Sequence, residues 1–394
     1  MKSWIEISES RLRGNVSAIR AAAGENVSVL AVIKADGYGH GAELVAPVLA
    51  DAGVAWLGVG DVDEGARVRR ALGKHEAQVV VMCGMVPGDA DLIVEHRLTP
   101  VIWTLSHVEA LETAAERAGR RVAVHLEIDS GMARQGAALG AELHSVTVAL
   151  RRTKWLRMEG VFSHLGSSEM RDGKNTAAQL KKLHEALGSI FSEGELMPEF
   201  LHLANSSALD EGSTTEWMQR RANEISASVL VRPGLALYGY CLQLENENGG
   251  GVQQSSGSRG ELCAEIQPVL TWKTRIIAIR EIAPGQTVGY GATFVAERPM
   301  RLALLPVGYA DGFRREGSSG IGDGWVRIAG QRAPVVGRVS MNLTVVDVTQ
   351  IAEAVEGAEV TLLGEGVTAE DHARWAETIP YEILCGIRAV RRLI

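Results

Sequence analysis

Short apolar runs rich in β-branched residues alternate with longer segments of helical period between residues 27 and 235. Such alternation predicts strand–helix units joined by right-handed crossovers. Eight runs have the length of buried strands: Val27–Lys34, Trp56–Gly60, Gln78–Cys83, Thr99–Trp103, Arg121–Asp129, Arg157–His164, Phe200–Asn205 and Ser228–Arg232. Repeated crossovers build an open doubly wound sheet or a closed barrel, and eight units favour an α/β fold of the (β/α)8, TIM-type barrel class.

Helix candidates lie between these runs. The clearest are Asp61–Leu72, Ser106–Ala118 and Ala177–Ser192. In the first, Asp61 has the residue type and position of an N-cap, and two further acids follow in the first turns.

The pattern changes after Tyr240. Residues Leu242–Gly260 are rich in Asn, Gly, Ser and Gln, which predicts an exposed flexible connector. Beyond it, strand-like runs predominate: Val269–Ile279, Arg301–Val307, Trp325–Ile328, Ala333–Ser340 and Val345–Val348. The helical segments expected there are Ile351–Val355 and Ala369–Glu377. We therefore expect a barrel domain over residues 1–244 and a mainly β domain over residues 245–394, with Trp4–Ile7 as an extra strand that could join the second domain.

Composition narrows the class of protein. With 394 residues the chain is long enough for two domains, and 46% hydrophobic and 22% charged residues are typical of a globular protein. The net charge of −8 is spread without long blocks, which argues against nucleic acid as a partner. No signal-peptide pattern and no apolar run of about 18 residues occurs, so we expect a cytoplasmic protein without a membrane partner. The four cysteines are far apart and match no zinc or disulfide pattern, which predicts reduced thiols and no metal site.

Lys34 lies in the most informative string, Ala-Val-Ile-Lys-Ala-Asp-Gly-Tyr-Gly-His-Gly over residues 31–41. The lysine ends an apolar run, and the carboxyl ends of barrel strands are where such folds hold their reactive groups. An amine there can form a Schiff base with a carbonyl cofactor, and the glycines that follow allow a bulky ligand to approach the backbone. The alternative is a solvated lysine at a strand end.

This string resembles the pyridoxal-phosphate lysine motif of bacterial alanine racemases. The resemblance implies a (β/α)8 barrel, a C-terminal β domain and a homodimer in which each active site uses both subunits. It also implies pyridoxal 5'-phosphate as cofactor, interconversion of L- and D-alanine, and supply of D-alanine for peptidoglycan. Lys34 would be a catalytic residue that also binds the cofactor, and Tyr38 in the same string would contact the cofactor.

Further strings match the family in order and spacing along nearly the whole chain. In Asp-Ser-Gly-Met-Ala-Arg-Gln-Gly over residues 129–136, Arg134 is similar to the family arginine that reaches the substrate carboxylate and the cofactor's phenolic oxygen. His164 resembles the histidine that orders a catalytic tyrosine. Asn205 and Ser206 resemble the family's cofactor-binding residues near the phosphate, whereas His202 is interpreted as a hydrogen-bonded core histidine.

The string Val-Arg-Pro-Gly-Leu over residues 231–235 implies three more contacts with the cofactor. By resemblance Arg232 hydrogen-bonds the pyridine nitrogen, and because a guanidinium only donates, it would keep that nitrogen neutral. Gly234 and Leu235 would offer backbone N–H groups to the phosphate. Tyr381, in the Ile-Pro-Tyr-Glu string near the C-terminus, resembles a tyrosine that also contacts the phosphate.

Two residues of the second domain complete the implied site. Tyr290, between two glycines in Val-Gly-Tyr-Gly-Ala-Thr, resembles the family's second catalytic base, and Met341 resembles a substrate-binding residue. A phenol has a pKa of about 10, so a base of this kind needs nearby support, which His164 linked to Arg232 could supply. The implied mechanism uses Lys34 for the D-enantiomer and Tyr290 for the L-enantiomer, on opposite faces of the α-carbon.

The chain departs from the family pattern at three places. Glu127 stands where many members have a carbamylated lysine that pairs with the active-site arginine, and we expect Glu127 to pair with Arg134 directly or through water. Asn342 replaces the usual aspartate, which makes the preference for alanine over serine or larger amino acids less secure. The basic C-terminal tail, Arg388–Ile394, matches poorly and has no functional interpretation.

Two other functions remain open on the sequence. One is a decarboxylase of the same barrel class that acts on basic amino acids, although the Tyr290 and Tyr381 strings favour a racemase. The other is a non-catalytic pyridoxal-phosphate carrier or amino-acid sensor, against which the second domain counts.

Overall fold

The computed structural model describes residues 2–171, 173–191, 196–246 and 260–394. The chain forms two compact units. The barrel unit comprises Leu12–Gly37 and Val45–Gln267, and the β unit comprises the residues before Leu12 together with Tyr38–Leu44 and Pro268–Ile394. The β unit includes Trp4–Ile7, the strand that the sequence allowed to join the second domain, and it also includes Tyr38–Leu44, which the sequence assigned to the barrel.

Eight parallel strands close into a barrel in the first unit, as predicted. Each strand pairs with the next along the chain, and the last pairs with the first. The strands are β2 (Val27–Val32), β3 (Trp56–Val59), β4 (Gln78–Val81), β5 (Thr99–Ile102), β6 (Val122–Asp129), β8 (Leu156–Phe162), β10 (Phe200–His202) and β11 (Ser228–Val231). Seven of the eight strands lie entirely within the predicted runs, and β8 begins one residue before its run. The agreement is close because a strand that is covered on both faces must be nearly continuously apolar, which makes it visible in the sequence.

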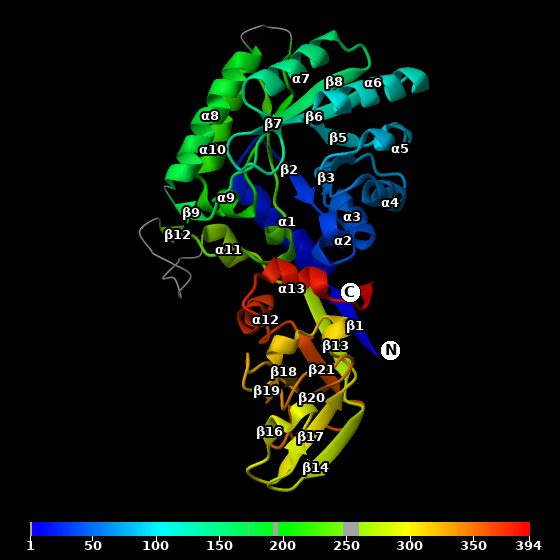
Figure 1. Cartoon of the computed structure of the whole chain (residues 1–394), viewed down its shortest axis with the longest axis vertical. Helices are drawn as coiled ribbons and strands as arrows, with labels where there is room; N and C mark the ends of the chain where they lie inside the picture. Colours follow the sequence, from blue (N-terminus) through cyan, green and yellow to red (C-terminus); the bar gives the residue numbers. More distant parts are fainter. Residues whose placement is uncertain (1, 172, 192–195, 247–259) are drawn as a thin grey trace. The chain divides into compact units, whose positions relative to one another are not determined.

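Helices surround these strands on the outside (Figure 1). They are α1 (Glu9–Ala23), α3 (Ala42–Asp51), α4 (Val62–Leu72), α5 (Ala90–Glu95), α6 (Leu105–Ala118), α7 (Ala141–Arg152), α8 (Lys174–Phe191), α9 (Ser206–Glu211), α10 (Ser213–Glu224) and α11 (Glu261–Glu265). The predicted N-cap is confirmed, because the Asp61 carboxylate accepts a hydrogen bond from Glu64 N at 2.8 Å. None of the helices in the described part of the chain has the length and apolar character that a membrane crossing needs.

The β unit contains sheets of six, three and two strands. The six-stranded sheet has the order β19-β18-β21-β13-β1-β22, the three-stranded sheet has the order β14-β17-β20, and β15 pairs with β16. The strands are β1 (Ser3–Ile7), β13 (Leu270–Arg275), β14 (Ala278–Ile282), β15 (Thr287–Val288), β16 (Phe294–Val295), β17 (Met300–Leu305), β18 (Trp325–Ile328), β19 (Gln331–Pro334), β20 (Thr344–Asp347), β21 (Glu359–Leu363) and β22 (Val390–Leu393). Two short helices, α12 (Ala369–Trp375) and α13 (Pro380–Gly386), belong to the same unit (Figure 1).

Several local predictions for this unit were wrong. The run Val269–Ile279 is split into two strands, which lie in different sheets, and Ile351–Val355 forms turns instead of a helix. Of the predicted connector Leu242–Gly260, residues 247–259 lie outside the described residues. The basic tail has a structural role, because β22 pairs in parallel with β1 and Arg391 Nε donates to Gly39 O at 2.7 Å.

Glu6 of β1 is a buried acid at the centre of a charged group in the β unit. Burial alone would raise its pKa, but hydrogen bonds from Trp4, Lys273 and Arg392 lower the pKa of Glu6 to about 2. Lys273 Nζ lies 2.9 Å from its carboxylate. The ionised form therefore stabilises the folded state.

We expect the free energy of unfolding to fall as the pH drops from about 4.5 towards 2. The folded-state pKa of Glu6 lies below its unfolded value, so its contribution is fully present above pH 4.5 and is lost as Glu6 becomes protonated. The contribution is at most about 3 kcal/mol, less after screening of the exposed partner Arg392. Urea unfolding of the wild type and of Glu6→Gln between pH 2.5 and 7 measures it. Equal pH slopes for both proteins would contradict the assignment, and Glu356→Gln, an exposed acid of the same unit, is the control.

Candidate active site

Lys34 follows β2 after one residue, Ile33, and opens an unusual left-handed turn. Ala35, Asp36, Gly37 and Tyr38 all have positive φ, between 52° and 64°. Non-glycine residues adopt this region at an energetic cost, so other contacts must hold the turn. In the described part of the chain the Lys34 amine has no hydrogen bond or ion pair. The turn therefore presents a free amine at the carboxyl end of a barrel strand.

Glu64, which the sequence marked only as an acid of the helix start, holds this turn. Its buried carboxylate accepts from Asp36 N and from Gly60 N, both at 2.7 Å. One side chain thus connects the loop after β2 to the loop after β3. The sequence offers one indication for Glu64, its position three residues after the N-cap Asp61. That position predicts a hydrogen bond to the N-cap backbone, and not the contacts with Asp36 N and Gly60 N.

Arg232 follows β11 and is almost fully buried. Its Nη2 donates to Ser163 O at 3.0 Å and to His164 Nδ1 at 3.1 Å, and its Nη1 donates to His202 Nδ1 at 3.2 Å. Burial lowers the pKa of Arg232 to about 10, so it remains a cation at neutral pH. The guanidinium is therefore fixed by partners on two other strand ends.

His164 is a neutral base surrounded by positive charge. Burial and the charges of Arg232, Arg134 and Lys34 lower the pKa of His164 to about 3. Because its Nδ1 accepts from Arg232, its proton lies on Nε2. Gln179 of α8, which the sequence did not single out, supports this loop by donating to His164 O at 2.9 Å.

The loop after β6 carries Arg134 as an exposed side chain. Asp129 Oδ1 accepts from three consecutive backbone N–H groups, of residues 131 to 133, at 2.8 to 3.2 Å, and so folds the loop tightly. At Gly136, with φ of 104°, a Cβ would lie 2.7 Å from Asp129 N, so only glycine fits. Arg134 itself makes no hydrogen bond or ion pair with the described residues.

Glu127 does not pair directly with Arg134. Its buried carboxylate instead accepts from Gln135 Nε2, and Gln135 Nε2 also donates to Met82 O at 2.9 Å. The reason is geometric, because the tight loop after β6 places the side chain of Gln135, and not that of Arg134, against Glu127. Burial raises the pKa of Glu127, whereas Gln135 and the charges of Arg232 and Arg134 lower it.

We expect Glu127→Gln to lower kcat/KM for the reaction at this site by about tenfold, since the Glu127 carboxylate is a negative charge that acts on Arg232 and Arg134. Gln135→Met, which keeps the charge and approximate side-chain length, should cost less. Steady-state rates of both variants, with thermal unfolding to check the fold, make the comparison. An unchanged rate in Glu127→Gln would contradict a role for the charge.

The ends of β10 and β11 form a compact group of hydroxyl and backbone donors. Ser206 Oγ accepts from Gly234 N at 3.0 Å and Ala236 N at 3.1 Å. Asn205 caps α9 by accepting from Ala208 N at 3.0 Å. The buried Leu235 N–H has no acceptor among the described residues, which is rare for a buried amide and leaves a donor for a ligand.

The remaining predicted site residues belong to the β unit. Tyr38 and Tyr381 lie together, with ring centroids 5.8 Å apart. Tyr290 and Met341 are exposed, with 70% and 56% of their surfaces accessible. The two residues lie on neighbouring loops. A Cβ at Gly289, the residue before Tyr290, would lie 3.3 Å from Arg338 N, and Arg338 is three residues before Met341. The backbone at Met341 is held in turn by Ala310 N, which donates to Met341 O at 3.0 Å.

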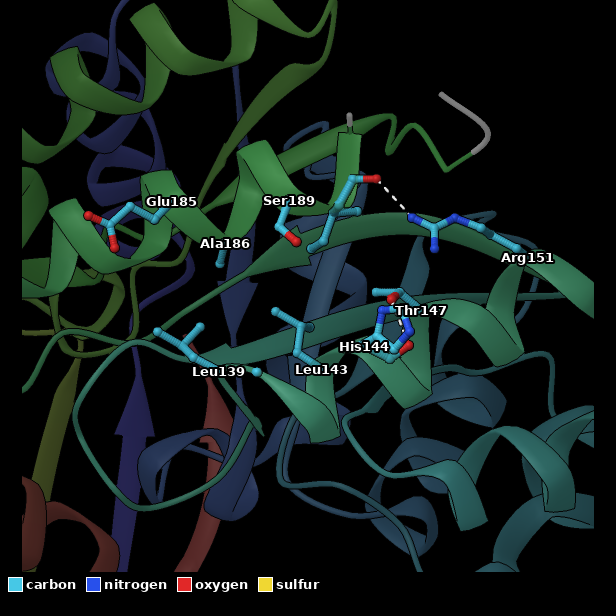
Figure 2. Close-up of a pocket in the computed structure, with 10 residues that line it drawn as sticks. Leu139, Leu143, His144, Thr147, Arg151, Glu185, Ala186 and Ser189 are labelled. Atoms are coloured by element: carbon cyan, nitrogen blue, oxygen red, sulfur yellow. Dashed lines mark hydrogen bonds between the residues drawn. The ribbon is translucent and has the colours of Figure 1, made fainter. Parts of the chain in front are cut away.

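A separate pocket of about 220 Å³ lies between α7 and α8 (Figure 2). His144, Thr147 and Arg151 of α7 face Glu185 and Ser189 of α8 across it. None of the candidate site residues lines this pocket, so it is distinct from the group at the strand ends.

Together, the fold and this group of residues define a lysine-centred barrel enzyme with an attached β unit. Comparison with known proteins identifies the family: residues 7–241 match the alanine racemase N-terminal domain and residues 269–394 match the alanine racemase C-terminal domain. The chain belongs to the alanine racemase family, whose members are isomerases.

Individual relatives agree with this assignment along the whole chain. An alanine racemase of Syntrophobacter fumaroxidans is 34% identical over 98% of this chain and 95% of its own length. The structure of alanine racemase from Streptomyces coelicolor A3(2) is 31% identical, covers 100% of this chain and 97% of its own, and has a TM-score of 0.85. The Bartonella henselae alanine racemase with covalently bound pyridoxal phosphate, 24% identical with a TM-score of 0.81 and full coverage of both chains, shares the fold.

Proposed function

We propose that this protein is a pyridoxal-phosphate-dependent alanine racemase that interconverts L- and D-alanine with two bases, Lys34 and Tyr290. The observation that carries the proposal is the unpaired Lys34 amine at a barrel strand end, whose charge acts on His164 together with those of Arg134 and the fixed cation Arg232. An unpaired amine in this place suits capture of a carbonyl compound.

The residues present fit pyridoxal phosphate. Lys34 would hold its carbonyl carbon, Arg232 its ring nitrogen, and the Ser206 hydroxyl with the unpaired Leu235 N–H its phosphate. Tyr38, His164, Asn205, Gly234 and Tyr381 are proposed as further cofactor contacts. The bound cofactor would supply an electron-accepting ring that acidifies the substrate α-proton.

The chain's own residues then have separate tasks. Arg134 and Met341 would bind the substrate carboxylate. The Lys34 amine and the Tyr290 phenol would each hold a proton on one side of the α-carbon, so that removal on one side and delivery on the other inverts the centre. His164, whose Nε2 carries its proton, would orient the phenol.

The exposed Tyr290 supports a homodimer with shared sites. A catalytic phenol that is 70% exposed has no surroundings of its own to orient it, and Met341 on the neighbouring loop is also exposed. A second copy of the chain would complete the site. The proposal also includes a cytoplasmic location and use of the D-alanine in peptidoglycan, both carried by the family resemblance.

Incubation of the purified protein and cofactor with L-alanine, L-serine and L-lysine in D2O tests the function. We expect D-alanine with deuterium at the α-carbon, measured by chiral chromatography and mass spectrometry. Carbon dioxide release from lysine would favour the decarboxylase, and bound cofactor without proton exchange would favour a carrier. Either result would replace the proposal.

A further inference from the structure

A row of buried polar side chains runs through the barrel interior from Arg232 to Glu159. His202 accepts from Arg232 and contacts His125, with His202 Nε2 and His125 Nδ1 3.0 Å apart. His125 Nε2 then faces Glu159 Oε2 at 3.5 Å. Both histidines are completely buried, and Arg232 and Glu159 are only 2% and 7% exposed. The row connects the candidate site to groups deep inside the fold.

The chemistry of the end groups determines where each proton lies. A guanidinium has no acceptor, so His202 Nδ1 must accept from Arg232 and a neutral His202 carries its proton on Nε2. That proton is donated to His125 Nδ1, so a neutral His125 also carries its proton on Nε2. The proton on His125 Nε2 faces Glu159 Oε2 at 3.5 Å, an electrostatic contact longer than a hydrogen bond, and neither atom has a hydrogen-bond partner among the described residues. The four side chains thus allow one arrangement of donors and acceptors.

The sheet is built to direct Glu159 into this row. The register of β6 on β8 shifts between Val124 and His125, which pair with Met158 and Gly160 and leave Glu159 as the extra residue of a bulge. Bulges change the direction of a side chain. At Gly160 a Cβ would lie 2.8 Å from the His125 ring, so the imidazole occupies space that only glycine leaves free.

The surroundings keep both histidines neutral. Phe162 stacks on the His202 ring with centroids 4.3 Å apart, and Trp56 packs 5.6 Å from the His125 ring. Burial lowers the pKa of both histidines.

The row ends in Arg232, on which the charges of Glu127 and Arg134 act, and in Glu159, which pairs with Arg157. Arg157 Nη2 lies 2.6 Å from Glu159 Oε1. Arg157 also pairs with the exposed Glu199, which touches neither histidine.

We propose that Glu159, His125 and His202 are positioning residues that set the orientation and hydrogen bonding of the Arg232 guanidinium. The inference rests on the proposed function for its catalytic consequence, because Arg232 would meet the cofactor's ring nitrogen. The negative charge of Glu159 holds the proton of His125, which fixes His202 as the acceptor that anchors Arg232 Nη1. The other end of the guanidinium remains bonded to Ser163 O and His164.

Histidine tautomers measured by long-range ¹H–¹⁵N NMR of the cofactor-loaded protein test the row directly. We expect His125 and His202 to be neutral with the proton on Nε2 between pH 6 and 8. Glu159→Gln should change the signals of both histidines. It should also lower kcat by about 10- to 100-fold, with little change in KM, as do changes to residues that orient metal-binding histidines, and should shift the ¹⁵N signal of the cofactor's ring nitrogen.

Matched variants separate this role from general stability. Glu199→Gln removes the other carboxylate bonded to Arg157 and should leave the histidine signals and kcat unchanged. Glu159→Asp keeps the charge and should recover much of the rate and of the wild-type histidine signals, which also covers the case in which Glu159→Gln unfolds. A proton on His202 Nδ1, or unchanged His202 signals in a folded Glu159→Gln protein, would overturn the proposal. The histidine tautomers can be measured without turnover, so the two proposals can fail separately. The expected tautomers in a protein that does not racemise alanine would reject the proposed function but support the proposed role of Glu159, His125 and His202.

Discussion

Mixing a Lys34→Ala chain with a Tyr290→Ala chain is expected to restore activity that neither variant has alone. Each single variant should lose about 10³- to 10⁴-fold in kcat, because each lacks one of the two groups that we propose hold the α-proton. In a hybrid dimer one site combines Lys34 of one chain with Tyr290 of the other and is intact. Random exchange of subunits makes about half the dimers hybrid, each with one working site of two, so about a quarter of wild-type activity should return.

The recovery depends on shared sites and therefore has a clear control. A chain with both substitutions, mixed with either single variant, can form no intact site and should restore nothing. Native mass spectrometry with one chain isotopically labelled measures the fraction of hybrid dimers. Demonstrated hybrids without activity would contradict the shared site, and an active monomer would contradict the need for a second copy.

Arg232→Ala is expected to produce the second large effect, on stability and rate together. The substitution removes the guanidinium that donates hydrogen bonds to His164, His202 and Ser163 O. It also takes away a cation that faces the buried Glu127 carboxylate. Loss of one partner from a buried charged group costs about 3 kcal/mol of unfolding free energy. Loss of a fixed donor in an active site should lower kcat/KM by about 100- to 1000-fold.

Arg232→Lys separates charge from geometry. An ammonium keeps the positive charge but lacks the planar fork that bonds two histidines on different strand ends, so we expect most of the stability to return and most of the rate loss to persist. Urea unfolding and steady-state kinetics on the same preparations measure both. Arg152→Ala, at an exposed arginine of α7, should change neither quantity. A full recovery of rate in Arg232→Lys would mean that charge alone matters.

The barrel was predictable from local pattern because its strands are short, apolar and separated by helices. The β unit was harder, since its sheets pair distant segments. β1, from the start of the chain, lies between β13 and the C-terminal β22, and no local signal marks such pairings. The predicted helix Ile351–Val355 failed for a related reason, because a short apolar segment takes its conformation from the surface that covers it.

The candidate site likewise has a part that the sequence predicts and a part that it does not. Four residues lie in recognisable motifs at the ends of predicted strands: Lys34, Arg134, His164 and Arg232. The residues that support them lie in no such motif. Gln135 was hidden beside a more conspicuous arginine, although it takes the bond with Glu127 that the sequence suggested for Arg134.

The sequence by itself determined the barrel, the mainly β second part and the candidate residues at the strand ends, because periodicity and short motifs are local properties. Only the tertiary structure decided which groups hold those residues. A β-bulge directs the side chain of Glu159 to His125. The Glu64 carboxylate connects two loops, and Arg391 donates to Gly39 O from the other end of the chain. Such contacts depend on how strands are registered and packed, and a one-residue shift in register would remove them.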